Sequence, residues 1–282
     1  MNSSLNYLIE LDEIFENKGW KNKENYLEVF TTLGRLTEFI SEDEKNYELL
    51  IELIKRFHWI SLNDYYNSCR KLLIEFSENL GHRIFKIYTF PIIKKRHEGT
   101  VKSGLFITYM IKAIIPTIPK LEKLNFEDII TYDDLKNKKF TKSDEILLVD
   151  DFIGTGNTFE SCINEIQAIN KDILDKVSVF TIAIKKDTLN EIRKNFTIYS
   201  NIEILKGITD YSTGDDIENK KKIMKQIEKK LFLNIKKYSL GFNQSESLIT
   251  LLRTPDTTFP IFWHEYKKRI KLKPPFPRHE KN

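Results

Sequence analysis

Hydrophobic residues in the first eighty positions recur at intervals of three and four. Three segments show this spacing most clearly: YLEVFTTLGRLTEFI (26–40), NYELLIELIKRFHWI (46–60) and LNDYYNSCRKLLIEF (62–76). Apolar side chains at these intervals line one face of an amphipathic helix, and Gly81 is placed to end the last one. The pattern predicts a helical region over residues 1–81. This region contains no glycine-rich turn, so we expect it to pack on the rest of the chain, on a second copy or on a partner.

After Gly81 the pattern changes to short apolar runs that alternate with helical segments. The predicted strands are RIFKIYTFPII (83–93), EILLVDD (145–151), KVSVFTIAI (176–184) and IEILKGI (202–208), with helices over 103–115, 157–169 and 187–195. This alternation is typical of an α/β protein with a parallel, doubly wound sheet covered on both faces. We expect this core over residues 82–210. Residues 211–282 are expected to form a helix with a solvated lysine face, a rigid proline-containing loop and a mobile proline-rich tail.

Composition narrows the class of protein. The chain has 282 residues, a net charge of only +4 and two widely separated cysteines, Cys69 and Cys162. The balanced charge gives no strong signal for nucleic-acid or membrane binding, and the cysteines are expected to be reduced structural thiols. The N-terminal MNSSLNYLIELDEIF lacks the basic start and apolar run of a signal peptide, and no zinc-binding spacing, GxxxxGK[ST] or GxSxG motif is present. These features predict a soluble, cytoplasmic protein.

The segment LLVDDFIGTGNTF (147–159) carries the most specific chemistry. Its apolar strand is expected to end on Asp150 and Asp151, at the edge of a parallel sheet where ligands bind. Carboxylates accept hydrogen bonds from the vicinal hydroxyls of a ribose, or bind Mg²⁺ through water. The next residues open a helix whose amides and hydroxyls form an anion cradle: Gly154, Thr155, Gly156, Asn157 and Thr158. Acids followed by a phosphate cradle fit a 5-phosphorylated ribose, whereas paired acids alone are typical of an exposed loop and a lone GTG of a turn.

This segment resembles the phosphoribosyl-pyrophosphate motif of type I phosphoribosyltransferases. The resemblance implies that Asp150 and Asp151 bind the ribose 2- and 3-hydroxyls together with Mg²⁺, and that residues 154–158 bind the 5-phosphate. It further implies a fold with a parallel-sheet core and a separate hood that recognises the base. Phosphoribosyl pyrophosphate would be the co-substrate.

The same resemblance implies a pyrophosphate site in the loop after the first core strand, KKRHEGTVKSG (94–104). Positive charge gathers there on Lys94, Lys95, Arg96 and Lys102, and amides are presented by Gly99, Ser103 and Gly104. We expect Lys102 to act catalytically by stabilising the departing diphosphate, and Ser103 and Gly104 to bind it. A solvated basic loop is the alternative. A flexible catalytic loop is expected within 131–145, with Lys139 and Lys142 as its candidate residues.

Departures from the family motifs limit which base could be the acceptor. Gly154 stands where the enzymes for 6-oxopurines carry an aspartate, so salvage of hypoxanthine or guanine is not expected. The proline-rich variant of the uracil enzymes is also absent. An orotate-like or unassigned transferase remains, or a protein that only binds the ligand.

KSGLFITYMIK (102–112), the acidic motif and LITLLRTPDTTFPIFW (248–263) are together similar to the PRTase-CE proteins of bacterial conflict systems. That resemblance implies an effector, such as a toxin, of a retron-type anti-phage defence system, whose partner would be a reverse transcriptase with its RNA and DNA. Arg253 and Asp256 are then expected to contact the acceptor base, and Trp263 either joins them or lies in the core. The alternative function is a non-catalytic module that senses a nucleotide or binds a partner.

Overall fold

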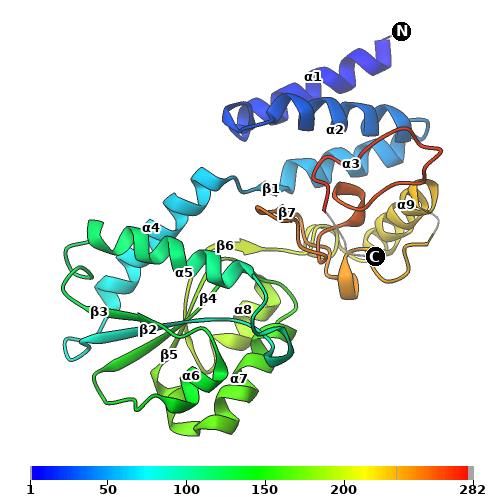
Figure 1. Ribbon diagram of the computed structural model, residues 1–282. Helices are drawn as coiled ribbons and strands as arrows, with labels where there is room; N and C mark the ends of the chain where they lie inside the picture. The colour runs from blue at the N-terminus through cyan, green and yellow to red at the C-terminus, as the bar shows by residue number, and fades with distance from the viewer. Residues whose placement is uncertain (1, 233, 279–282) are drawn as a thin grey trace. The chain divides into compact units, whose positions relative to one another are not determined.

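Two compact units make up the structure, a computed structural model that describes residues 2–232 and 234–278. Residues 62–204 form a unit that contains the large sheet, and residues 1–61 together with 205–282 form a helical unit (Figure 1). The sheet unit is thus continuous in sequence, and the helical unit is assembled from two separate segments.

The sheet unit is built on a five-stranded sheet with the strand order β3-β2-β4-β5-β6. Its strands are β2 (Lys86–Pro91), β3 (Asn125–Asp128), β4 (Asp144–Ile153), β5 (Val177–Lys185) and β6 (Thr197–Ile204). Its helices are α4 (Leu62–Asn79), α5 (Ser103–Ile114), α6 (Tyr132–Asn137), α7 (Asn157–Ile169) and α8 (Lys186–Ile192). All neighbouring strands run parallel, so each connection crosses over through a helix. The predicted parallel α/β fold is confirmed.

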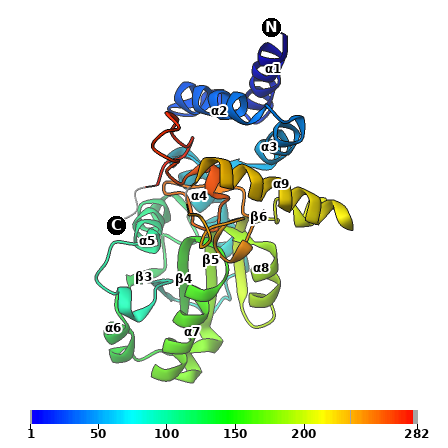
Figure 2. The same ribbon diagram turned by 90° about the vertical axis from the view of Figure 1, so that its right-hand side faces the viewer.

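Helices cover both faces of this sheet. The α6, α7 and α8 side chains form one hydrophobic cluster with alternate strand residues, among them Phe90, Ile146 and Leu148. Helices α4 and α5 pack on the other face (Figures 1 and 2). Strand β5 is buried along its whole length. This explains its unbroken apolar sequence, because a central parallel strand has no solvent-facing side.

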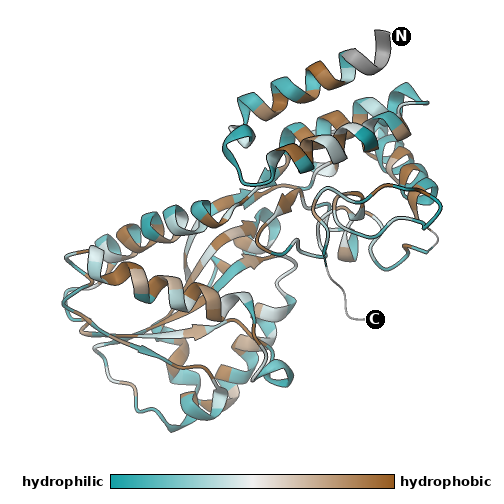
Figure 3. Cartoon of the chain, turned by 45° about the horizontal axis from the view of Figure 1, so that its top comes forward, coloured by the Kyte–Doolittle hydropathy of each residue, from teal (hydrophilic) through white to brown (hydrophobic). Residues whose placement is uncertain are grey.

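The helical unit contains α1 (Asn2–Asn17), α2 (Tyr26–Ile40), α3 (Glu44–Arg56) and α9 (Asp215–Leu231), together with β1 (His58–Trp59) paired in parallel to β7 (Ile249–Thr250). Hydrophobic residues alternate with hydrophilic ones along α1 (Figure 3), as expected for a helix with one buried face. A single core cluster joins apolar residues of both sequence segments. The helical N-terminal region predicted from the spacing is therefore present.

A buried carboxylate fixes one turn of the helical unit. Glu246, which is 1% exposed, accepts hydrogen bonds from the backbone amides of Ile208 (3.0 Å) and Thr209 (2.8 Å). The Thr209 hydroxyl donates to the same carboxylate at 2.7 Å, and Lys221 Nζ lies 3.2 Å from it. Four donors thus surround one negative charge and tie the chain after β6 to the loop that precedes β7.

The grouping of α4 differs from the predicted division into residues 1–81, 82–210 and 211–282. In the structure α4 belongs to the sheet unit, because its buried residues pack on α5 and β6. The ring of Phe76, for example, meets that of Tyr199 on β6 edge-on at 5.3 Å. The boundary between the compact units therefore follows Ser61.

The stretch expected to be a mobile tail is packed as far as it is described. Phe276 is buried, and its ring stacks on Phe57 with centroids 5.1 Å apart. Its backbone amide donates to Phe262 O at 2.8 Å, and Arg278 donates to Thr254 O at 3.1 Å. The prediction of mobility is wrong for residues 271–278, because an aromatic anchor outweighs the polar composition around it. Residues 279–282 lie outside the described part of the chain.

Candidate functional site

The candidate site lies at the point in the sheet where the order of the strands reverses. From β2 the chain crosses to β3 on one side and then to β4 on the other, so the crevice of a doubly wound sheet lies between the carboxyl ends of β2 and β4. Strand β2 ends at Pro91, opposite Val149. Asp150 and Asp151 follow Val149 directly, and the basic loop 94–102 follows β2. The fold therefore brings the acidic pair and the basic loop to the same end of neighbouring strands.

Strand β4 continues past the acids, contrary to the expectation that it ends on them. Asp150 pairs with Thr181 and Ile153 with Ile184, because β5 extends far enough to support these residues. Side chains of a strand alternate between its faces. This alternation breaks between Leu148 and Ile153, because Ile153 lies in the same hydrophobic cluster as Ile146 and Leu148. The hydrogen-bond partners of each acid therefore show what it faces.

Two helices donate hydroxyl groups to the acidic pair. Ser103 Oγ, at the start of α5, donates to Asp150 Oδ1 at 2.6 Å. The Tyr65 hydroxyl, on α4, donates to Asp151 Oδ2 at 2.8 Å. The backbone amide of Asp151 also donates to Asp150 Oδ1 at 2.9 Å. Each carboxylate thus accepts a hydrogen bond from a side-chain hydroxyl.

Burial raises the pKa of both carboxyl groups, and the Asp151 charge adds to the rise in the pKa of Asp150. Desolvation disfavours the charged form of both groups, and like-charge repulsion adds to this effect at Asp150. Such a pair favours ligands that donate hydrogen bonds or positive charge, which is the chemistry expected for sugar hydroxyls or Mg²⁺.

A close helix–strand contact positions Ser103. A Cβ added to Gly104 would lie 2.7 Å from Val149 O and 2.9 Å from Pro91 Cβ. Only glycine lets α5 approach β2 and β4 this closely, and the approach brings the Ser103 hydroxyl to Asp150. Gly104, predicted to present its amide to a ligand, thus has a packing role in the structure; its contact with a ligand stays a prediction.

The turn between β4 and α7 contains the predicted anion cradle. Gly156 directly precedes α7 and has a φ of +82°. The residue that caps the helix is therefore in the left-handed conformation, which glycine adopts readily. The Thr188 hydroxyl on α8 donates to Gly154 O at 2.7 Å and fixes the turn. Asn157 and Thr158 are exposed at the first turn of α7. A helix N-terminus with accessible amides favours a phosphate or another anion.

The basic loop concentrates positive charge next to this edge of the sheet. The pKa of His97 is lowered by burial and by the charges of Lys102, Arg96 and Lys94, which places these cations around one imidazole. Glu98 anchors the loop by accepting the backbone amide of Tyr132. The loop is therefore cationic, and Glu98 anchors it to the start of α6.

Two predicted residues do not reach the site. Helix α6 fills the first half of the segment expected to be a flexible catalytic loop. Lys139 and Lys142 are exposed between α6 and the start of β4 at Asp144. Six strand residues, or about 20 Å, separate that start from Asp150. The structure therefore places both lysines at the amino end of β4, away from the acids.

Two further residues lie near the site and were missed from the sequence. Tyr65 belongs to a helix whose periodicity indicates only packing. Lys185, 5% exposed, closes β5 at the same edge of the sheet. The signal for Lys185 was a charge at the end of the apolar run VFTIAIK; Tyr65 had no signal of its own, because a buried tyrosine fits any apolar stripe.

The C-terminal candidates belong to the other compact unit. Arg253 is exposed and Asp256 is half-buried in the helical unit, and their contact with an acceptor stays a prediction. Trp263 is 1% exposed, and its Nε1 donates to Thr258 O at 2.9 Å. The core alternative therefore holds for Trp263.

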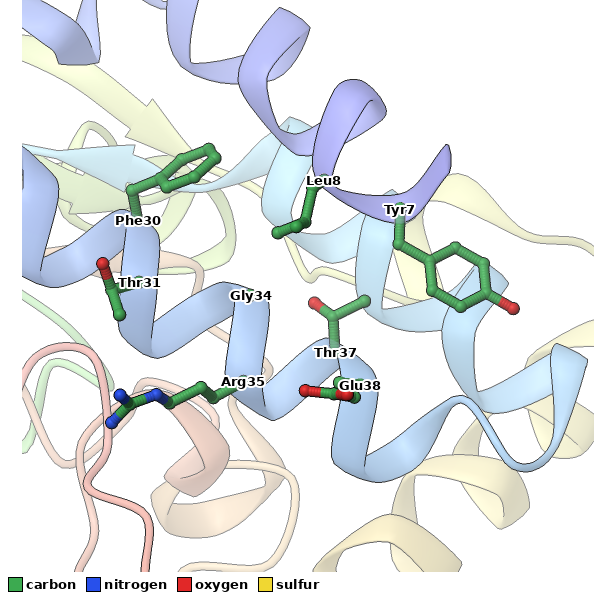
Figure 4. A pocket seen from close by; sticks show the side chains of 8 residues that line it. All are labelled: Tyr7, Leu8, Phe30, Thr31, Gly34, Arg35, Thr37 and Glu38. Carbon is green, nitrogen blue, oxygen red and sulfur yellow. The ribbon is translucent and has the colours of Figure 1, made fainter. Parts of the chain in front are cut away.

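A separate hollow of about 330 Å³ lies between α1 and α2 (Figure 4). Its lining contains little polar chemistry beyond Arg35 and Glu38; the full set is Tyr7, Leu8, Phe30, Thr31, Gly34, Arg35, Thr37 and Glu38. These residues face a gap between two helices rather than converge on a point. The hollow is therefore not a candidate catalytic site.

The donor set limits how a metal would be held. No group of three or more His, Cys, Asp and Glu side chains suited to a metal ion occurs in residues 2–232 and 234–278. Two carboxylates offer hard oxygen ligands, which Mg²⁺ prefers while it keeps waters and substrate phosphates as its remaining ligands. The acidic pair fits that mode. Both cysteines are buried and free, and among the described helices none is long and apolar enough to cross a bilayer.

Parallel sheet, acidic pair, glycine turn and basic loop together define a phosphoribosyltransferase-like fold. The family model PRTase-CE matches residues 32–278, and the chain belongs to this family. A comparison with curated proteins finds no match.

Solved structures with a similar fold include purine phosphoribosyltransferases. The hypoxanthine-guanine enzyme of Schistosoma mansoni in complex with IMP matches with a TM-score of 0.33 and 16% identity, over 51% of this chain and 65% of that one. A hypothetical protein of Neisseria gonorrhoeae with bound ppGpp matches with a TM-score of 0.37 and 16% identity, over 60% and 97%. The adenine enzyme of Giardia lamblia with 9-deazaadenine matches with a TM-score of 0.31 and 11% identity, over 49% and 78%.

Proposed function

We propose that this chain binds phosphoribosyl pyrophosphate or a nucleotide together with Mg²⁺ and transfers or removes a ribosyl-phosphate group. The observation that carries the proposal is the pair Asp150 and Asp151, each bonded to a side-chain hydroxyl, shortly before the turn that opens α7. The carboxylates accept the ribose hydroxyls, and residues 154–158 bind the 5-phosphate. One ligand then lies along one strand-to-helix turn.

The reaction exchanges the group on C1 of the ribose. The bond between C1 and the diphosphate oxygen breaks, the electron pair leaves with diphosphate, and a nitrogen of the acceptor base forms the new bond and loses its proton. Removal of a base from a nucleotide by pyrophosphate is the same exchange in reverse. The cations of the loop 94–102 stabilise the diphosphate charge, with Lys102 next to Ser103 at the start of α5.

Mg²⁺, when bound, neutralises phosphate charge. Asp150 and Asp151 would hold it through their oxygens or through water. Acceptor choice falls to the C-terminal hood loop with Arg253 and Asp256, and Gly154 argues against a 6-oxopurine acceptor because the aspartate expected for it is missing.

Membership of the PRTase-CE family supports a biological setting. We propose that the protein is a cytoplasmic effector of a retron-type anti-phage system, where a reverse transcriptase with its RNA and DNA restrains it, as a homo-oligomer or within a complex. A non-catalytic nucleotide sensor is the second candidate. The position of Lys139 and Lys142 away from the acids favours it, because the expected catalytic loop then lacks its lysines.

One assay separates transferase from sensor. The purified full chain is incubated with Mg²⁺, phosphoribosyl pyrophosphate and a panel of bases, and separately with pyrophosphate and the nucleoside monophosphates. Chromatography measures release of diphosphate or base. A transferase turns over at least one pair, and the double variant Asp150→Asn, Asp151→Asn does not. Tight binding without turnover supports the sensor, and absence of both binding and turnover contradicts the proposed function.

A further inference from the structure

The hydroxyl of Tyr65 reaches the site from a helix outside the predicted core. Tyr65 lies in the first turn of α4 and is 1% exposed, and its hydroxyl donates to Asp151 Oδ2 at 2.8 Å. Its ring meets that of Phe106 on α5 edge-on at 5.9 Å. The ring is thus fixed by packing, and the hydroxyl is held at one carboxylate oxygen.

The face of α4 that carries Tyr65 lies against Asp151. Cys69 follows one helical turn later and is fully buried. Burial, with a contribution from the Asp151 charge, raises the pKa of Cys69 to about 12. These observations agree that α4 covers one side of the acidic pair.

The chemistry of this contact is specific. A phenylalanine would fill the same space, so packing alone does not require the hydroxyl. Hydrogen bonds to an ionised carboxylate are stronger than neutral ones and fix its orientation. A carboxylate has two oxygens and about four lone-pair positions. When Tyr65 holds one oxygen, the lone pairs of the other keep a defined direction.

We propose that Tyr65 is a positioning residue that orients the Asp151 carboxylate to accept a ribose hydroxyl and so enables the site to distinguish ribose from deoxyribose phosphates. The inference rests on the proposed function, since it assumes a sugar phosphate at Asp151. It assigns to α4, which lies within the predicted helical region 1–81, a part in sugar selection in addition to packing.

The test compares sugars that differ by one hydroxyl. Binding of ribose 5-phosphate and of its 2-deoxy and 3-deoxy analogues to the full chain is measured by calorimetry with Mg²⁺ present. Wild type should bind ribose 5-phosphate about tenfold or more tightly than one of the analogues. Tyr65→Phe should weaken ribose 5-phosphate about tenfold and leave that analogue unchanged, so that the discrimination is lost.

Two comparisons separate orientation from a general loss of structure. Tyr266→Phe removes another buried tyrosine hydroxyl, one that donates to Ile261 O at 2.6 Å in the helical unit, and should leave the discrimination intact. In a double-mutant cycle, Tyr65→Phe should add no further loss to Asp151→Asn, because its effect passes through that carboxylate. Tyr65→Leu is a second variant without the hydroxyl, so a folding defect of one substitution does not decide the result.

The possible results distinguish failure of the Tyr65 proposal from failure of the proposed function. If wild type discriminates the sugars and both Tyr65 variants do so equally well, the role of Tyr65 is refuted and the proposed function stands. Equal weakening of all three sugars by Tyr65→Phe also refutes it, since that is the signature of a structural role. If wild type binds none of the sugars, and also neither phosphoribosyl pyrophosphate nor a nucleotide, both proposals fail.

Discussion

Glu246 in the helical unit is a buried carboxylate and Asp150 and Asp151 in the sheet unit are half-buried ones, and their surroundings differ. Glu246 in the helical unit is surrounded by two backbone amides, a hydroxyl and the Lys221 ammonium. Asp150 and Asp151 in the sheet unit lie next to each other, and burial together with the Asp151 charge raises the pKa of Asp150. Ser103 donates to Asp150, and Tyr65 donates to Asp151. A carboxylate with a full set of donors fixes structure, whereas the acidic pair is predicted to bind a ligand.

The largest expected effect is on ligand affinity, and it tests whether the acidic pair binds a ligand rather than stabilises the fold. Asp150→Asn with Asp151→Asn should weaken binding of phosphoribosyl pyrophosphate and Mg²⁺ by about 4 kcal/mol, roughly a thousandfold, because two charge-assisted hydrogen bonds are lost. The melting temperature should not fall, since the substitution removes like-charge repulsion. Calorimetry and thermal unfolding measure the two quantities. Unchanged affinity would contradict the assigned role of the pair.

The opposite result is expected at Glu246. Glu246→Ala should lower the free energy of unfolding by about 3 kcal/mol, because buried amides and a lysine lose their acceptor. Denaturant titration of the full chain measures the change, and Glu42→Gln is the control. Glu42 forms its ion pair with Lys230 at the surface, so its loss should change little. A Glu246 variant as stable as wild type would remove the basis of the comparison.

A third change tests the packing that brings α5 to the acids. Gly104→Ala should lower the free energy of unfolding by about 2 kcal/mol, because the new methyl group overlaps Val149 O and Pro91. It should also weaken ligand binding by moving Ser103 from Asp150. Gly81→Ala is the matched control, since its added Cβ would meet only Ile84, at an ordinary 3.9 Å. Equal behaviour of the two variants would show that the close approach is not needed.

The smallest effect concerns pH. Since burial and the Asp151 charge raise the pKa of Asp150, the folded chain binds this proton more tightly than the unfolded chain does. The ionised pair thus destabilises the fold once the pH rises through the raised pKa, and this cost is absent below the ordinary aspartate range. Asp150→Asn should therefore be more stable than wild type by about 1 kcal/mol near pH 8, with the difference vanishing towards about pH 4.

Glu127 provides the control with the opposite sign. Hydrogen bonds from Lys138 and Lys86 lower its pKa, so its stabilisation is present at neutral pH and is lost as the pH falls through the lowered pKa. Wild type should be more stable than Glu127→Gln at neutral pH and lose that advantage in acid. Melting curves across the pH range measure both pairs. The same slope for both would show that the acids of the pair are not perturbed as described.

Much of the sheet could be predicted because its signals are local. The apolar runs of β4 and β5 and the turn at Gly156 follow from residues that are adjacent in sequence. Strand β3, Asn125–Asp128, was not predicted, because NFED has neither an apolar run nor a clear alternation. Its strand conformation depends on pairing with β2, from Lys86–Asn125 to Thr89–Asp128. A short edge strand is fixed by its neighbour rather than by its own propensity.

In the candidate site, too, the features formed by neighbouring residues could be predicted and those formed by distant residues could not. Asp150, Asp151 and the cradle are contiguous and were predicted together. The donation by Tyr65 joins positions 86 residues apart, and the β4 extension depends on the length of β5. The lysines of the expected catalytic loop illustrate the reverse error: they precede the acids closely in sequence, but a ten-residue strand carries the chain to the other end of the sheet.

The interrupted sequence of the helical unit has a consequence for its synthesis. Its core needs Phe57 from the first segment and Phe262 and Phe276 from the last, with the whole of residues 62–204 made in between. Ribosomes add roughly 5–20 residues per second. About ten seconds or more therefore pass between synthesis of α2 and α3 and synthesis of the C-terminal residues that cover their apolar faces. The sheet unit can fold during this time. During that interval the apolar faces of the nascent helices are exposed and can associate prematurely.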